Sequence, residues 1–168
     1  MYKFLNIILI TFFLASKCYS EIINKVNVVN NERITKETIL VFSNIEIGKN
    51  YELNDLDQII KDLYQTNFFS NISLNLNNGI LTIDVTENKI IQEIKINGIK
   101  KTELVDILKK QLLLKDKNPF VENFVSSDID RIQKILKNSG YYFSSVSEKL
   151  IINENNTVNL IYDINLGE

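Results

Sequence analysis

Residues 67–87 read Asn-Phe-Phe-Ser-Asn-Ile-Ser-Leu-Asn-Leu-Asn-Asn-Gly-Ile-Leu-Thr-Ile-Asp-Val-Thr-Glu. Apolar and polar residues alternate on both sides of the central Asn77-Asn78-Gly79, which is the pattern of two half-buried strands. An Asn-Gly pair supplies the positive φ angles that a tight hairpin turn requires. The stretch therefore predicts an antiparallel hairpin with one face in a core and the other in water.

Two helices and a short strand are predicted before this hairpin. Lys25–Val29 alternates loosely and predicts the strand. Thr35 can cap a first helix that ends near Phe42, and Asn54 followed by Asp57 has the spacing of a second cap. The second helix is predicted from one apolar stripe at the spacing i, i+3, i+4, i+7, namely Leu56, Ile59, Ile60 and Leu63.

The same order of elements recurs in the second half of the chain. A strand at Glu93–Asn97 ends at Gly98, and a helix is predicted to begin near Thr102. Ser127 and Asp130 repeat the cap spacing of the first half. The closing hairpin is predicted at Phe143–Ile152 and, after a turn at Asn155-Asn156, at the apolar positions Val158, Leu160, Tyr162, Ile164 and Leu166.

The repeat predicts an α+β fold of two tandem β-α-α-β-β modules, at residues 21–87 and 88–168. Each module is expected to form a three-stranded mixed sheet covered on one face by two helices. The second copy has longer loops, and its main insertion, Lys115–Asn123, contains Pro119, the only proline. Because the first strand joins one side of the hairpin, each sheet is expected to keep an open edge.

Residues 1–20 are predicted to be a signal peptide. Lys3 gives a basic start, and Phe4–Leu14 is an almost unbroken apolar run that is shorter than the roughly 20 residues needed to cross a bilayer. Small or polar residues follow as far as Ser20, so cleavage is placed between Ser20 and Glu21. The alternative is an uncleaved membrane anchor.

Composition argues against most catalytic chemistry. The chain has no histidine, and its single cysteine, Cys18, is lost with the leader. Loss of Lys3 and Lys17 leaves 17 of the 19 basic residues against 21 acidic ones, a net charge of −4. An acidic chain is a poor partner for nucleic acid. We expect no enzyme, no catalytic residue, no metal, no cofactor and no small-molecule substrate.

The aspartates and the clustered aromatic residues are both expected to have structural roles. The aspartates are expected to cap helices or to lie on solvated helix faces: Asp55, Asp57, Asp62, Asp128 and Asp130. Phe68-Phe69 and Tyr141-Tyr142-Phe143 are expected to pack the end of each second helix onto its sheet. The alternative for these aromatic residues is an exposed platform for a partner.

The candidate binding site is an edge strand. Ser70, Asn71, Ser73 and Asn75 form a polar stripe on a strand predicted to lie at the sheet edge. The unpaired N–H and C=O groups of such a strand can bind an extended peptide with little regard to its sequence. The alternative is that these residues only keep the edge soluble.

Three stretches carry a resemblance to a known family: Leu63–Ile72, Val85–Glu87 followed by Ile91–Gly98, and Gly140-Tyr141-Tyr142. In this order and behind a signal peptide, they resemble the POTRA repeats of outer-membrane barrel-assembly and secretion proteins, over residues 22–168. Asn30 and Asn67 stand where the family usually has glycine, and asparagine tolerates the left-handed conformation.

The resemblance implies an exported protein of the periplasm that faces the outer membrane. Its partners would be unfolded outer-membrane proteins, periplasmic chaperones and accessory subunits of barrel assembly. Clients would add a strand at the edges that map to Phe69–Leu76 and Phe143–Ile151, which adds Ser145, Ser147 and Lys149 to the candidate site.

The transmembrane barrel of the family is missing from these residues, so association with the membrane is expected only through a barrel outside them. The chain is expected to be either a part of a longer product or a free-standing periplasmic protein. Two other assignments stay open: the repeat pair of a two-partner secretion or translocation transporter, and a related scaffold of cell division.

Overall fold

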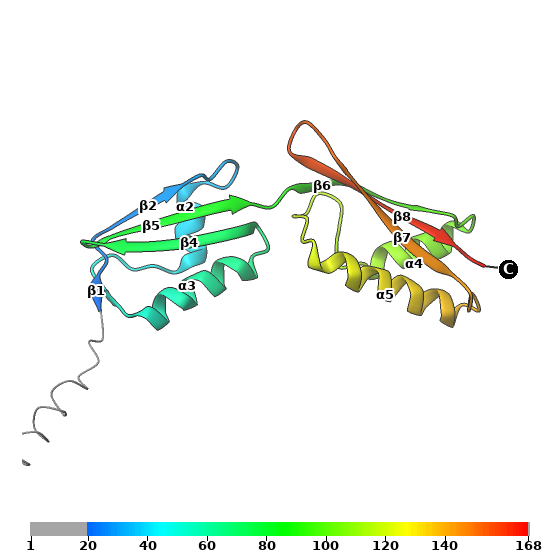
Figure 1. The fold of residues 1–168 in the computed structure, drawn as a ribbon, viewed down its shortest axis with the longest axis horizontal. Helices are drawn as coiled ribbons and strands as arrows, with labels where there is room; N and C mark the ends of the chain where they lie inside the picture. Colours follow the sequence, from blue (N-terminus) through cyan, green and yellow to red (C-terminus); the bar gives the residue numbers. More distant parts are fainter. Residues whose placement is uncertain (1–19, 168) are drawn as a thin grey trace, which may run out of the picture. The chain divides into compact units, whose positions relative to one another are not determined.

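The computed structural model describes residues 20–167 (Figure 1), so all of the predicted signal peptide except Ser20 lies outside the described residues. The first repeat contains β1 (Glu21–Ile22), β2 (Lys25–Val29), α2 (Lys36–Ser43), β3 (Asn50–Tyr51), α3 (Leu53–Gln65), β4 (Phe69–Asn77) and β5 (Ile80–Glu87). The second contains β6 (Ile90–Asn97), α4 (Thr102–Gln111), α5 (Asn123–Asn138), β7 (Ser145–Ile152) and β8 (Thr157–Asn165). None of the helices within residues 20–167 has the length and apolar character of a membrane span.

Within the described residues the chain divides into two compact units, residues 20–63 with 72–85 and residues 64–71 with 86–167. Both repeats have a three-stranded sheet with the last strand in the centre, in the orders β2-β5-β4 and β6-β8-β7. The first strand runs parallel to the central strand in each sheet, and β7 runs antiparallel to β8. Figure 1 shows both helices of each repeat on one side of its sheet. The predicted α+β fold of two β-α-α-β-β modules is confirmed.

The alternation in the central strands separates core from solvent. On β5 the buried hydrophobic side chains are Leu81, Ile83 and Val85, and on β8 they are Val158, Leu160, Tyr162 and Ile164. The predicted helical stripes are buried at Leu63 of α3 and at Leu136 of α5, both fully removed from solvent. Burying a leucine side chain contributes roughly 1.5–3 kcal/mol, so these stripes hold the helices on their sheets.

Three local signals act as the sequence predicts. Thr35 caps α2, since its Oγ1 accepts a hydrogen bond from the Thr38 N–H at 3.3 Å. Asn30 and Asn67 adopt left-handed backbone conformations with φ of 61° and 60°. Asparagine therefore stands in for glycine at both turns, as its short polar side chain allows.

The predicted caps of the two longer helices are wrong. α3 begins one residue before Asn54, and α5 begins four residues before Ser127, so both residues lie inside helices. Asp55 explains the earlier start of α3, because its Oδ2 accepts a hydrogen bond from the Glu52 N–H at 2.8 Å. An acidic residue at the third helical position that bonds back in this way is half of a capping box.

The predicted position of Asp128 on a solvated helix face is also wrong, because its side chain is fully buried. Its carboxylate accepts hydrogen bonds from the Leu113 N–H at 2.5 Å, the Leu114 N–H at 3.1 Å and the Tyr162 hydroxyl at 3.3 Å. Burial, together with the negative charge of Asp128, raises the pKa of Tyr162 well above its usual range. Asp128 thus joins the connection between α4 and α5 to the central strand β8.

The aromatic residues that follow the second helix are buried differently in the two repeats. Phe69 is buried at 3% exposure, as predicted, but Tyr142 and Phe143 are 71% and 80% exposed, so the packing prediction is wrong for these two. The reason is local: Gly140 follows the end of α5 with φ of +94°, a turn comes next, and β7 begins only at Ser145. The aromatic pair therefore precedes the strand and lies outside the sheet.

Candidate functional site

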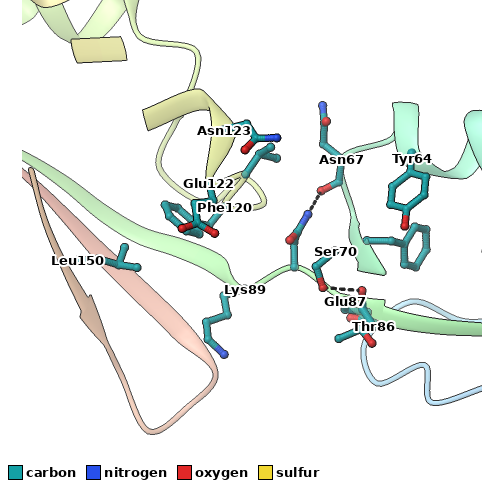
Figure 2. A pocket seen from close by; sticks show the side chains of 13 residues that line it. Tyr64, Asn67, Ser70, Thr86, Glu87, Lys89, Phe120, Glu122, Asn123 and Leu150 are labelled. Carbon is teal, nitrogen blue, oxygen red and sulfur yellow. Dashed lines mark hydrogen bonds between the residues drawn. The ribbon is translucent and has the colours of Figure 1, made fainter. Parts of the chain in front are cut away.

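The candidate binding residues lie on two edge strands, since β4 and β7 each have a sheet neighbour on one side only. All seven of their side chains are exposed: Ser70, Asn71, Ser73 and Asn75 on β4, and Ser145, Ser147 and Lys149 on β7. The hydroxyl of Ser70 is bound within its own sheet, because it donates to the Thr86 carbonyl at 3.2 Å (Figure 2).

The opposite edge of the second sheet, β6, is covered along its first half. The connection between α4 and α5 contributes an N–H from Lys117 to the Ile91 carbonyl at 2.7 Å, and the Asn118 carbonyl accepts the Ile91 N–H at 2.9 Å. The Asp116 Oδ1 accepts the Ile94 N–H at 2.6 Å. The insertion of the second repeat thus occupies groups that another strand would need.

The opposite edge of the first sheet, β2, is contacted by a lysine from the start of α2. The Lys36 Nζ donates to the Val26 carbonyl at 2.6 Å. A charged side chain held over an edge strand is a common device against strand pairing. In both sheets the edge formed by the first strand is therefore blunted, that is, protected against pairing with another strand.

The register of β7 shows which of its residues offer free backbone groups. The Asn153 N–H donates to the Thr157 carbonyl at 2.9 Å, and the antiparallel pairing continues without a bulge from Ile152↔Val158 to Ser145↔Asn165. Because bonded and non-bonded pairs alternate in an antiparallel ladder, the N–H and C=O groups directed away from β8 belong to Val146, Glu148, Leu150 and Ile152.

Sequence reasoning missed these four residues, Val146, Glu148, Leu150 and Ile152. Ser145, Ser147 and Lys149 lie at the alternate positions, where the backbone is directed toward β8. The sequence does contain a signal, the turn at Asn155-Asn156, but its loop length must be known before the alternation can be assigned. On β7, Ser145, Ser147 and Lys149 therefore contribute side chains to the candidate edge, whereas Val146, Glu148, Leu150 and Ile152 contribute the outward backbone groups.

The two edges also differ in side-chain chemistry. On β4 the exposed residues are polar, and Leu74 and Leu76 are half-buried. On β7 three consecutive apolar side chains are exposed: Leu150 at 40%, Ile151 at 38% and Ile152 at 65%. An exposed apolar edge is a strong candidate for pairing with another chain.

A pocket of about 490 Å³ lies within the second compact unit. Figure 2 shows Leu150 and Phe120 on its apolar side, where Val121 also lines it. The Asn88 side chain in this pocket already donates to the Asn67 carbonyl at 2.9 Å. Within residues 20–167, no three acidic, cysteine or histidine side chains are grouped so that they could hold a metal ion.

Replacing Asp116 by alanine is expected to open part of the β6 edge. The Ile94 N–H loses its 2.6 Å acceptor, which costs about 1–2 kcal/mol. Native-state hydrogen exchange should show faster exchange at the Ile94 amide, while the Ile91 amide, held by the Asn118 carbonyl, stays protected. Equal protection of Ile94 before and after the substitution would show that the carboxylate does not cover this edge.

Comparisons with known proteins agree with this geometry. The chain is 28% identical over 140 residues to the outer membrane protein assembly factor BamA of Neorickettsia risticii (strain Illinois), a match that covers 83% of this chain and 18% of that protein. The chain therefore spans less than a fifth of the length of this relative.

Two solved structures share the fold. The N-terminal domain of Omp85 from the cyanobacterium Thermosynechococcus elongatus has a TM-score of 0.58 at 14% identity, covering 89% of this chain and 64% of that one. The POTRA1-2 segment of the periplasmic domain of Omp85 from Anabaena has a TM-score of 0.53 at 16% identity, covering 89% and 98% of the two chains. The family model described as "POTRA: Surface antigen variable number repeat" matches residues 21–88 and 89–167. The chain belongs to the POTRA family and contains two of its repeats.

Proposed function

We propose that this chain is the periplasmic polypeptide-binding and scaffolding region of an outer-membrane β-barrel assembly factor. It takes up unfolded outer-membrane protein precursors by β-augmentation, the addition of a client strand to a sheet edge. The observation that carries the proposal is the contrast between edges: the first strand of each sheet is blunted, whereas β4 and β7 are the exposed edges. Similarity to BamA supports this assignment.

Edge pairing suits a binder of many unfolded clients. Each main-chain hydrogen bond contributes about 0.5–1.5 kcal/mol net, whatever side chain the client residue carries. A few such bonds give weak, reversible binding, so a client can move on to the next step of assembly. Periplasmic chaperones that deliver clients and accessory subunits of barrel assembly are the further partners in this proposal, and the work of the repeats is binding and not catalysis.

Export to the periplasm is part of the proposal, with cleavage between Ser20 and Glu21. The first residue after that cut belongs to the fold, since the Glu21 carboxylate accepts a hydrogen bond from the Gly79 N–H and Ile22 pairs with Asn50. Ile23, next in the chain, is fully buried. These contacts support a mature chain that begins at Glu21.

Site-specific photo-crosslinking tests the function. A crosslinker at Ser73 or Ser147, on the two edges, is expected to capture unfolded outer-membrane protein at least several-fold more than one at Lys61, an exposed position on α3. Clients held unfolded in dilute urea and a folded soluble protein serve as the two added substrates. Equal capture from the helix and from the edges would count against β-augmentation.

A further inference from the structure

The two faces of β7 offer a docked strand different surroundings. The residues with outward backbone groups, Val146, Glu148, Leu150 and Ile152, pair with the core residues of β8: Ile164, Tyr162, Leu160 and Val158. Since paired residues share a sheet face, these four side chains are directed to the helix-covered side. Ser147, Lys149 and Ile151 are directed to the other side.

The helices leave the far half of β7 uncovered on that side. Leu150 and Ile152 are 40% and 65% exposed although they lie on the core face. Leu150 lines the same pocket as Phe120 and Val121, which precede α5 (Figure 2). A strand added to β7 would therefore place every second side chain over an apolar surface.

We infer that β7 selects client strands in which apolar residues alternate with polar ones, with the apolar residues on the helix side. The inference rests on the proposed function, because it assumes that a strand docks at this edge. Alternation of this kind is the sequence signature of strands that form membrane β-barrels. A uniformly polar segment would make the same backbone bonds but would leave Leu150 and Ile152 exposed.

Glu148 adds a charge requirement at one position. It lies on the same face as Leu150, close enough to Tyr162 for its negative charge to help raise the pKa of that phenol. Opposite charges across neighbouring strands are favourable, so a basic client residue is preferred opposite Glu148. An antiparallel client would read apolar-x-apolar-x-basic, and a parallel client would read basic-x-apolar-x-apolar.

The other edge provides a weaker selection of this kind. The exposed side chains of β4 are all polar, namely Ser70, Asn71, Ser73, Asn75 and Asn77, while Leu74 and Leu76 are half-buried. A strand docked on β4 would therefore gain less from apolar contacts than one docked on β7, and its affinity would depend more on backbone bonds. The second repeat thus prefers amphipathic strands more strongly than the first does.

Amide chemical shifts of the full chain, titrated with short peptides, test this inference. One peptide alternates as Val-Thr-Leu-Thr-Lys-Thr-Val, and a rearranged peptide of the same composition reads Val-Leu-Val-Lys-Thr-Thr-Thr. The alternating peptide is expected to bind about tenfold more tightly and to shift the amides of Glu148, Leu150 and Ile152. The amides of Ser147 and Lys149, which are directed toward β8, should move less.

A matched pair of variants separates the two faces of β7. Leu150→Asn and Ile151→Asn change neighbouring residues of nearly equal exposure, 40% and 38%, on opposite faces. Leu150→Asn is expected to raise the Kd of the alternating peptide about tenfold, and Ile151→Asn less than twofold. Glu148→Lys should transfer the preference from the lysine peptide to one with glutamate in its place.

The outcomes distinguish the inference from the function on which it rests. Equal affinity of the two peptides, or equal losses in Leu150→Asn and Ile151→Asn, would overturn the selection while leaving edge docking in place. If no peptide or unfolded client shifts any amide of β4 or β7, the proposed function itself fails. Shifts at β7 that depend on protein concentration without peptide would identify a second copy of the chain as the occupant and overturn the inference.

Discussion

Gly98→Ala is expected to lower the free energy of unfolding of the second repeat by about 3–5 kcal/mol. Gly98 follows β6 with φ of +87°, and a β carbon built there would lie 1.7 Å from the Ile164 carbonyl oxygen. The left-handed conformation costs an ordinary residue roughly 1–2 kcal/mol. The remaining roughly 2–3 kcal/mol is at the upper end of the usual cost of forcing extra atoms into a packed site, as the 1.7 Å contact requires.

Gly140→Ala is the matched control in the same repeat. Its φ of +94° is close to that of Gly98, but apart from its chain neighbours nothing lies within 4 Å of the added β carbon. The difference between the two variants therefore isolates the contact with the Ile164 carbonyl from the cost of the backbone conformation. We expect Gly140→Ala to cost about 1–2 kcal/mol.

Native-state hydrogen exchange at the amides of β8 gives the stability of the second repeat without interference from the first. Amides of Leu160 and Tyr162, in the middle of the central strand, exchange through large openings of the repeat. Their protection should fall in Gly98→Ala by a factor of about 100 or more, as 1.4 kcal/mol corresponds to tenfold. Equal losses in the Gly98 and Gly140 variants would show that the contact with Ile164 is relieved at no cost.

The hairpins and helical stripes were predictable because their signals are local. The alternation of residues 72–85 and the Asn-Gly turn determine which side of each strand is buried, and the structure agrees. The same is true of Thr35, whose cap depends on residues three positions apart. Such patterns need only the geometry of one helix or one strand.

The errors arose where a residue's surroundings come from distant parts of the chain. Nothing in the neighbourhood of Asp128 predicts that the peptide groups of Leu113 and Leu114 and the Tyr162 hydroxyl converge on it. The candidate site shows the same division. The edge position of β7 follows from the topology of the sheet. Which of its backbone groups are directed away from β8 depends on the exact register of the hairpin, which periodicity alone does not give.

The coverage of β6 illustrates this limit further. The insertion with the only proline is visible in the sequence as a longer loop, and Pro119 itself pairs across to Ile90. Its length does not reveal that it lies along an edge strand. Once that contact is known, the insertion has a physical role, because it leaves β7 as the exposed edge of the second sheet.

Asp128→Ala is expected to lower the free energy of unfolding of the second repeat by about 3–5 kcal/mol. The substitution leaves three donors without their acceptor, the N–H groups of Leu113 and Leu114 and the Tyr162 hydroxyl. The Leu114 N–H and the Tyr162 hydroxyl are buried, and each costs about 1–3 kcal/mol when it loses its partner, whereas the part-buried Leu113 N–H costs less. Asp130→Ala, two residues along α5 at an exposed position, should change stability by less than about 0.5 kcal/mol.

Tyr162→Phe separates the contribution of the strand β8 to this loss of stability from that of the loop at Leu113 and Leu114. It removes only the 3.3 Å bond to Asp128, so about 1 kcal/mol is expected, and the double variant should cost less than the sum because both changes act on one network. Exchange at the Leu113 and Leu114 amides should accelerate in Asp128→Ala but not in Tyr162→Phe. If Asp128→Ala and Asp130→Ala have equal stability, the buried carboxylate does not hold the connection between α4 and α5 against β8.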